Sequence, residues 1–258
     1  MRILYYIPGL IATFSLIVIL LITSVEAVVY WTPDYFEKEY EKYRVTEDVA
    51  MKMTDLLTVT EHMMNYLRGD EEELQITTVI AGKERNFFSS RELAHMVDVK
   101  NLFLGGLALR KISILVLAAS VTVLAAGRHL RVLLQGILVG TGIFLSAICL
   151  LFVVASTDFT KYFTLFHRIF FDNDLWILDP DTDLLINIVP EPFFIDTAAR
   201  IGVLFAVSLA AVMAVCLLFL IKSAKLNRNC LFKKKVHKEK GTAGCITLNE
   251  SEKRVKTL

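Results

Sequence analysis

The chain has 258 residues, of which 55% are hydrophobic, and its formal net charge is only +1. A mean hydropathy of +0.53 excludes an ordinary soluble protein and predicts a mainly α, polytopic membrane protein with four transmembrane helices and a small extracytoplasmic cap. A chain that is nearly neutral overall also lacks the strongly basic balance of a nucleic-acid-binding protein, so we expect no nucleic-acid partner.

The first apolar stretch runs from residue 3 to residue 25. Crossing a bilayer takes about 20 apolar residues, whereas the apolar core of a signal peptide usually has about 7–15. We therefore interpret residues 1–30 as a cytoplasmic start and an uncleaved first transmembrane helix. A cleaved signal peptide is the alternative.

Residues 31–101 form the first predicted extracytoplasmic segment. Thr46 is suited to cap a helix whose apolar residues recur at three- and four-residue spacing as far as Leu67, and Gly69 is suited to end it. Residues 74–80 and 85–88 then predict a short hairpin.

A capping box, Ser-x-x-Glu, follows at Ser89 and Glu92 and predicts the start of a helix that contains His95. Glu92 and Asp98 are three residues before and after His95, so both carboxylates are expected on the same helix face, where they could orient the imidazole. The alternative is an ordinary surface network. The helix is expected to continue into the second span, with Gly105 and Gly106 as a potential bend.

The second transmembrane helix is assigned to residues 102–126, and it contains Arg110 and Lys111. A basic residue at the bilayer centre costs about 2.5–3.5 kcal/mol, so we expect both side chains to reach back toward the interface. The remaining segments are a cytoplasmic link at 127–132, a third helix at 133–155, a second extracytoplasmic segment at 156–200, a fourth helix at 201–221 and a basic tail at 222–258.

Charge is distributed unevenly between these segments. The tail has 11 basic and 3 acidic residues, whereas residues 31–101 have 9 basic and 15 acidic residues and residues 156–200 have 3 and 8. Because basic loops stay in the cytoplasm, both termini are predicted inside and both acidic segments outside. We expect the tail to be flexible and to be attracted to anionic lipids.

The second extracytoplasmic segment is rich in aromatic residues around His167, which predicts a helix lying in the membrane interface. His95 and His167 should then lie on the same side of the membrane, where neutral imidazoles can move protons. The run from Asp179 to Asp183 resembles the start of a calcium loop, but Leu184 occupies the glycine position and Pro190 the glutamate position. A capped turn is the preferred interpretation.

The chain has no serine-hydrolase elbow and no zinc-protease motif, and none of its four cysteines lies in the outer segments. These absences favour acid–base chemistry in which the substrate supplies its own nucleophile, with no cofactor and no metal. Two alternatives remain: a membrane metallohydrolase that uses His62, His95, His167 and a carboxylate, and a non-enzymatic membrane sensor or accessory subunit.

Several blocks of residues resemble those of the bacterial lipoprotein intramolecular transacylases, four-span membrane proteins of Gram-positive bacteria. The resemblance covers roughly residues 46–200. The blocks are Asn65-Tyr66-Leu67, Phe88 to Glu92, His95-Met-Val-Asp98-Val-Lys100, Phe166-His167-Arg-Ile-Phe170-Phe171, Trp176, Ile188-Val-Pro190 and Phe193-Phe194.

The resemblance implies an acyltransferase that moves the sn-2 acyl chain of a diacylglyceryl lipoprotein onto the α-amino group of its N-terminal cysteine, giving a lyso-form lipoprotein. It implies that His95 and His167 are catalytic, on the extracytoplasmic face of the cell membrane, with lipoproteins and membrane lipids as partners. We expect Glu92, Asp98 and Lys100 to support them, and expect substrate contacts from Asn65, Tyr66, Phe166, Phe170 and Trp176.

Overall fold

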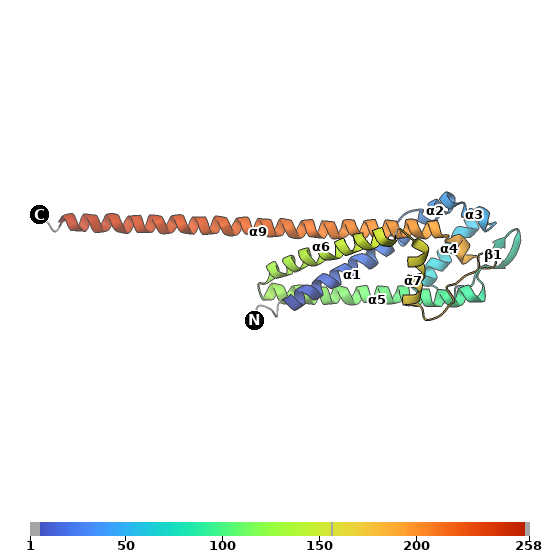
Figure 1. The fold of residues 1–258 in the computed structure, drawn as a ribbon. Coiled ribbons are helices and arrows are strands. Elements are labelled where there is room, and N and C mark those ends of the chain that lie inside the picture. The colour runs from blue at the N-terminus through green and yellow to red at the C-terminus, as the bar shows by residue number, and fades with distance from the viewer. Residues whose placement is uncertain (1–5, 156, 256–258) are drawn as a thin grey trace.

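The structure is a computed structural model that describes the backbone of residues 6–155 and 157–255 and the side chains of residues 6–154 and 157–225. Long helices form a bundle at one end, and a small cap of short elements covers the other (Figure 1). The first residues of the predicted first span, and the side chains of most of the basic tail, lie outside the described part.

Among the described residues, four helices are long and apolar enough to cross a membrane, which confirms the predicted fold class. Each contains one of the four apolar stretches of the sequence, and together they account for most of its hydrophobic residues. They are α1 (Tyr6–Tyr30), α5 (Ser90–Ala126), α6 (Leu130–Ala155) and α9 (Glu191–Val255).

Helix α1 contacts each of the other three spans, α5, α6 and α9. Gly140 of α6 lies so close to it that an added Cβ would be 2.5 Å from Cγ2 of Thr13, so a larger residue would clash with that side chain. Such small-residue contacts are a common basis of helix association in membranes. On another face, the Ile22 side chain of α1 lies 3.5 Å from the Cβ position of Gly106 in α5.

Arg110 has an ion-pair partner that the sequence did not indicate. Its guanidinium donates to the Glu26 carboxylate of α1 in an ion pair whose side chains are 19% and 7% exposed. The compensating charge therefore lies on a different helix. A charge inside a span is tolerated when it is paired in this way.

The cap is built around its own apolar core. Its elements are α2 (Tyr35–Tyr43), α3 (Val45–Asp48), α4 (Met53–Arg68), the strands β1 (Thr77–Ile80) and β2 (Lys83–Asn86), α7 (Phe159–Phe170) and α8 (Leu185–Ile188). Tyr40, Val45, Leu56, Val59 and Ile188 are almost completely buried in the core.

The helix that the sequence predicts from Thr46 to Leu67 is in fact two helices. Val49 and Met51 turn into the core, and Ala50 adopts a left-handed conformation with φ 51°, which ends α3 before α4 begins. The predicted stop at Gly69 is confirmed: it caps α4 with φ 85°.

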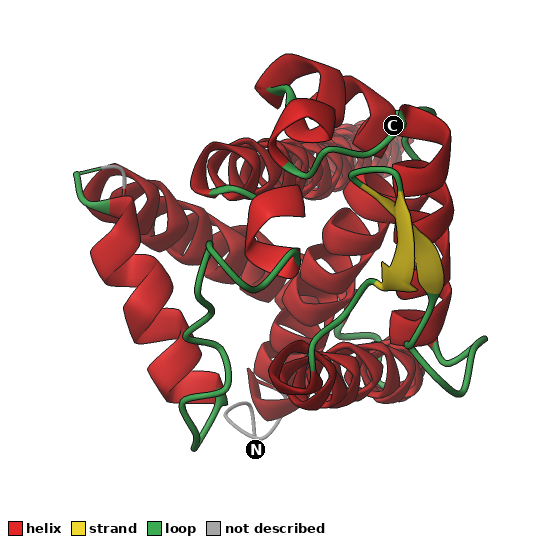
Figure 2. Ribbon diagram, turned by 90° about the vertical axis from the view of Figure 1, so that its right-hand side faces the viewer, coloured by secondary structure: helices red, strands yellow, loops and turns green. Residues whose placement is uncertain are grey.

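The predicted hairpin is confirmed, but its first strand is shorter than expected and its second begins two residues earlier. Thr77 pairs with Asn86 and Ile80 with Lys83, which leaves a two-residue turn, Ala81-Gly82, in which both residues have positive φ. A two-residue turn of this kind matches the twist of the strands. Figure 2, which looks along the bundle from the cap end, shows the hairpin at one side of the cap.

Polar contacts tie the cap to the beginning of α9. Arg200 pairs with the buried Glu39 of α2 at 2.5 Å, and the Tyr35 hydroxyl lies 2.5 Å from Oγ1 of Thr197. Helix α9 then continues without a break to Val255, where the sequence predicts a flexible tail. No proline follows Pro192, so the sequence contains no strong helix breaker there.

Candidate active site

The first turn of α5 fixes the position of His95. The predicted capping box is present: the Ser89 hydroxyl accepts from the backbone N–H of Glu92, and the Glu92 carboxylate accepts from that of Ser89 at 2.6 Å. The other Glu92 oxygen accepts from the backbone N–H of Leu185 at 2.5 Å. One oxygen of Glu92 therefore caps α5 and the other holds α8 against it, so neither is used to orient His95.

His167 lies on α7, which runs across the ends of the spans (Figure 1). Its Nδ1 is 2.8 Å from the carbonyl oxygen of Phe163, one turn earlier. A carbonyl can only accept, so Nδ1 carries the proton and Nε2 keeps its lone pair. The ring is packed between aromatic neighbours, with Phe163 at 4.2 Å and Trp176 at 4.9 Å between centroids.

The two histidines meet at the junction between the cap and the spans. Their ring centroids are 6.1 Å apart, and Phe171 packs against both, at 5.3 Å from His95 and 5.6 Å from His167. The sequence placed both residues on the same side of the membrane. The structure brings them together within one aromatic pocket.

This pocket favours neutral imidazoles. His95 is 7% exposed and His167 is 8% exposed, and Nδ1 of His95 has no hydrogen-bond partner among the described residues. Burial lowers the pKa of His167 below its usual value, although the Phe163 carbonyl partly opposes that shift. Burial and the nearby second imidazole likewise disfavour a charge on His95. Neutral histidine is the form that can accept a proton.

The loop after α7 is held against α5 by side chains of its first turns. Asn173 donates to the Asp98 carboxylate at 2.9 Å, and the Arg91 guanidinium donates to the carbonyl of Ile177 at 3.0 Å. Asp98 therefore holds the loop that carries Phe171 and Trp176.

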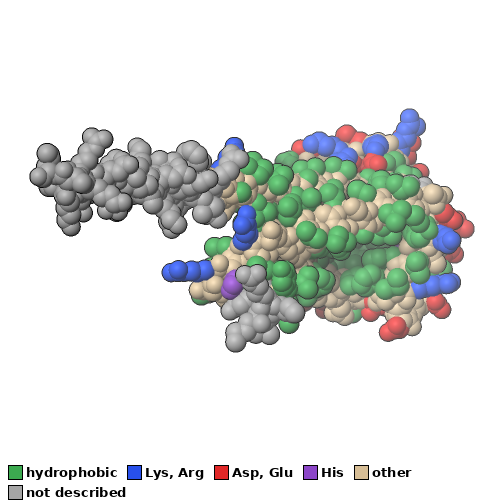
Figure 3. Space-filling model, turned by 60° about the vertical axis from the view of Figure 1, so that its left-hand side comes forward, with side chains coloured by type: hydrophobic (Ala, Val, Ile, Leu, Met, Phe, Trp, Pro, Cys, Tyr) green, Lys and Arg blue, Asp and Glu red, His purple; other side chains and the backbone are tan. Residues whose placement is uncertain are grey.

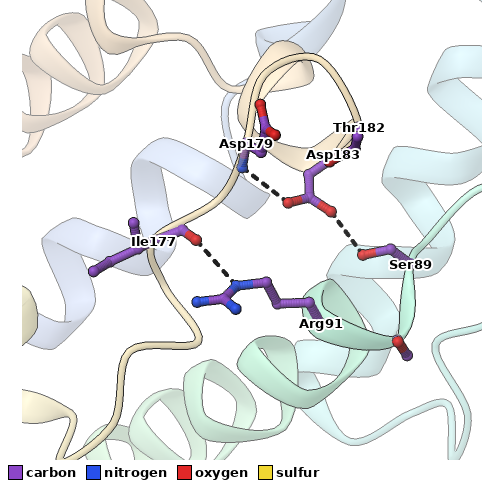
Figure 4. Close-up of a pocket in the computed structure, with 7 residues that line it drawn as sticks. Ser89, Arg91, Ile177, Asp179, Thr182 and Asp183 are labelled. Carbon is purple, nitrogen blue, oxygen red and sulfur yellow. Dashed lines mark hydrogen bonds between the residues drawn. The ribbon is translucent and has the colours of Figure 1, made fainter.

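A cavity of about 410 Å³ lies beside this loop, at the beginning of α5. Asp183 extends into it and accepts from the Ser89 hydroxyl at 2.8 Å and from the backbone N–H of Asp179 at 2.9 Å (Figure 4). These contacts fit the interpretation of residues 179–183 as a capped turn. The histidine pair does not line this cavity.

The donor set expected for a metallohydrolase does not converge. Among the side chains of residues 6–154 and 157–225, no group of three or more His, Cys, Asp or Glu is arranged to hold a metal ion. His62 lies on α4, and its Nε2 is buried without a hydrogen-bond partner among the described residues.

Residues 10–194 match the sequence profile of the family described as lipoprotein intramolecular transacylase, which covers well over half of the chain. The chain belongs to the lipoprotein intramolecular transacylase family. A comparison with curated proteins finds no match.

Solved structures of one transacylase of this family have the same fold. The membrane-integral lipoprotein intramolecular transacylase of Bacillus cereus aligns with a TM-score of 0.72 and 21% identity, over 88% of this chain and 100% of that one. Two of its histidine variants, one to arginine and one to alanine, align with TM-scores of 0.69 at 20% and 19% identity, over 87% and 86% of this chain and 95% and 96% of theirs.

The remaining residues that the transacylase resemblance singled out fall into two groups. Lys100 lies with its ammonium 3.8 Å from the ring centroid of Tyr66 and donates to the carbonyl of Glu71 at 2.9 Å, so the two residues join α5 to the end of α4. Asn65 lies at the same end, where its carbonyl accepts from the backbone N–H of Gly69. Lys100 and Tyr66 therefore hold the end of α4 against α5, and the Asn65 carbonyl helps to end α4 at Gly69.

Aromatic residues surround the histidine pair. Trp176 packs against His167 with the two rings tilted by 31°, whereas the ring centroids of Phe166 and Phe170 lie 4.7 Å from each other on the exposed face of α7. Three contributors to the site were not expected from the sequence: the Phe163 carbonyl, Phe171 and Arg91. Only the spacing of Phe163, four residues before His167 on a helix, could have indicated the first of these contacts.

Proposed function

We propose that the chain is a lipoprotein intramolecular transacylase that uses His95 and His167 as an acid–base pair. It moves the sn-2 acyl chain of a diacylglyceryl lipoprotein to the α-amino group of its own N-terminal cysteine, giving a lyso-form lipoprotein. The observation that carries the proposal is the meeting of two buried, neutral histidines from α5 and α7, in a chain whose family carries out this reaction.

The reaction needs one proton to be taken up and one to be delivered. The amine attacks the ester carbonyl, the bond to the glyceryl oxygen breaks, and the amine's proton ends on that oxygen. His95 has an unpartnered ring nitrogen and is assigned the uptake of this proton. His167 is assigned its delivery, because the Phe163 carbonyl and the Trp176 ring support a transient imidazolium. Because Nε2 of neutral His167 carries no proton, the proton passes from His95 to that nitrogen before His167 delivers it to the glyceryl oxygen.

Substrate geometry supplies much of the remaining rate. The amine and the ester belong to one molecule, so their encounter needs only the correct conformation and no second substrate. The aromatic walls around His167 are suited to hold a folded glyceryl-cysteine unit and to exclude water, which would otherwise hydrolyse the ester.

The charge distribution supports an orientation with the cap outside the cell and both termini in the cytoplasm. The cap segments are acidic, and the tail has 11 basic against 3 acidic residues. In that orientation the tail would face anionic lipids of the inner leaflet, and the histidine pair would lie where lipoproteins are anchored.

The test is mass spectrometry of a synthetic diacylglyceryl lipopeptide incubated with the protein in lipid bilayers. His95→Ala and His167→Ala should each lower the rate of lyso-product formation by about 10²–10⁴-fold, the usual effect of removing an acid–base group. His62→Ala is the matched control, because it removes a cap histidine outside the pair and should keep the parent rate. An N-acylated lipopeptide should not react.

Both histidine variants forming product at the parent rate would disprove the assignment. Loss of activity in His62→Ala, together with its recovery on adding zinc, would favour the metallohydrolase. A parent chain that forms no lyso product while binding lipopeptide would favour the non-enzymatic alternative.

A further inference from the structure

Helices α5 and α6 are close together at only one end of the bundle. A short link, residues 127–129, joins them at the end far from the cap, and toward the cap they diverge while α7 crosses between them (Figures 1 and 2). The clusters of buried apolar side chains show the same divergence. Leu124 of α5 and Leu133 of α6 share one cluster near the link, whereas the cluster nearer the cap joins α1, α6 and α9 without any described residue of α5.

Apolar residues follow His95 along α5 in the direction of the link. His95, Leu102 and Leu109 follow one another at seven-residue spacing and therefore lie on one face of α5. The rise per residue places Leu102 about 10 Å and Leu109 about 21 Å from His95 along the helix. Leu109 is 47% exposed. We call the space between residues 102–116 of α5 and 139–154 of α6 the α5–α6 cleft.

The surface around the spans is apolar, and it is hollowed near the charged cap end (Figure 3). Inside a bilayer only hydrocarbon can fill such a space, because exposed polar groups there would lack partners. A lipid whose ester reaches the histidine pair must direct its acyl chains away from the cap, and the α5–α6 cleft leads in that direction. Helix α7 closes the cleft at the height of His167.

We propose that the α5–α6 cleft is the lateral entrance through which the diacylglyceryl substrate leaves the bilayer, and that it holds the acyl chains during transfer. The proposal rests on the proposed function, since it takes a diacylglyceryl lipopeptide as the occupant. The polar glyceryl-cysteine unit lies under α7 beside the histidines, and the chains extend along Leu102 and Leu109 toward the link.

The first test uses a lipopeptide with a photoreactive diazirine in its sn-1 chain, bound to the His95→Ala variant in bilayers. Crosslinks should form between residues 102 and 112 of α5 and should be displaced by excess unlabelled lipopeptide. The same diazirine on a phospholipid should label the outer faces of the spans more evenly. Lipopeptide crosslinks distributed as those of the phospholipid would overturn the proposal.

The second test narrows the cleft. Leu109→Trp places a large ring within it, whereas Leu115→Trp places the same ring on a different face, about 120° around α5, where Leu115 is 71% exposed, and serves as the matched control. Leu109→Trp should raise KM about tenfold for a long-chain substrate, equivalent to losing the burial of roughly two methylenes, and should have little effect on a short-chain substrate. Leu115→Trp should change neither. Equal effects of both variants would refute the cleft.

Crosslinking does not require turnover. A parent chain that crosslinks in the cleft but forms no lyso product would contradict the proposed function and support the cleft. A chain that forms product without cleft crosslinks would do the reverse.

Discussion

Glu92 provides a sharp test of how the site is held together. The carboxylate is 1% exposed and is the acceptor for two backbone donors, Ser89 N–H at 2.6 Å and Leu185 N–H at 2.5 Å. Glu92→Ala leaves both without this acceptor. An unsatisfied buried donor costs about 1–3 kcal/mol. The Leu185 N–H is buried and should cost the upper part of that range. The Ser89 N–H is partly exposed and should cost the lower part. We therefore expect a loss of about 2–4 kcal/mol in the free energy of unfolding.

The measurement is equilibrium unfolding in mixtures of a mild detergent and dodecyl sulfate, with product formation followed in parallel at two temperatures. Glu92→Gln keeps one acceptor oxygen and should lose about half as much stability as Glu92→Ala. In both variants activity should fall with the folded fraction and recover on cooling. If Glu92→Ala unfolds like the parent while its rate falls at every temperature, Glu92 acts on His95 chemistry and the capping argument is refuted.

Four further predictions follow from other parts of the molecule. Gly140→Ala should destabilise the protein by about 1–3 kcal/mol, because the new methyl meets Cγ2 of Thr13, and Thr13→Ser should restore stability in the double variant by removing that Cγ2. The lowered pKa of His167 predicts full activity at neutral pH and a loss of activity below the ordinary histidine pKa of about 6.5. The unfolded chain binds the extra proton in that acid range, so the free energy of unfolding should also fall there. A bell-shaped pH profile of activity centred above pH 8 would contradict this. Activity should survive exhaustive chelation, and its loss with zinc-dependent recovery would contradict the non-metal mechanism. In a cysteine-free background, an impermeant thiol reagent should label a cysteine placed at Glu72 but not one at Lys240 in intact cells, and labelling of the latter would reverse the orientation.

Several parts of the site could be predicted from residues that lie close together in the sequence. The Ser89–Glu92 capping box involves residues three apart, so its chemistry can be read directly from the sequence, and the structure has it as predicted. The spans follow from apolar length alone. His95 and His167 could be assigned to the same side of the membrane from loop charges, although their 6.1 Å separation could not.

Long-range contacts could not be read in this way. The ion pair of Arg110 was missed because its partner, Glu26, lies 84 residues earlier on another helix. Glu92 was expected to orient His95 because both lie on one helix face, but the N–H of Leu185, 93 residues away, uses the oxygen that the capping box leaves free. The break between α3 and α4 depends on burial of Val49 and Met51, which helix periodicity does not reveal.

The uninterrupted length of α5 couples the site to the thickness of its host membrane. A helix of 37 residues is about 55 Å long, whereas the hydrocarbon layer is about 30 Å thick, so α5 is long enough to extend past this layer as a single stiff rod, with His95 in its first turns. A thinner or thicker bilayer changes the tilt of such a rod and, with it, the depth at which the imidazoles meet the ester. We expect turnover to pass through a maximum as lipid chain length is varied in reconstituted membranes, and a flat response would show that the cap, and not α5, sets this depth.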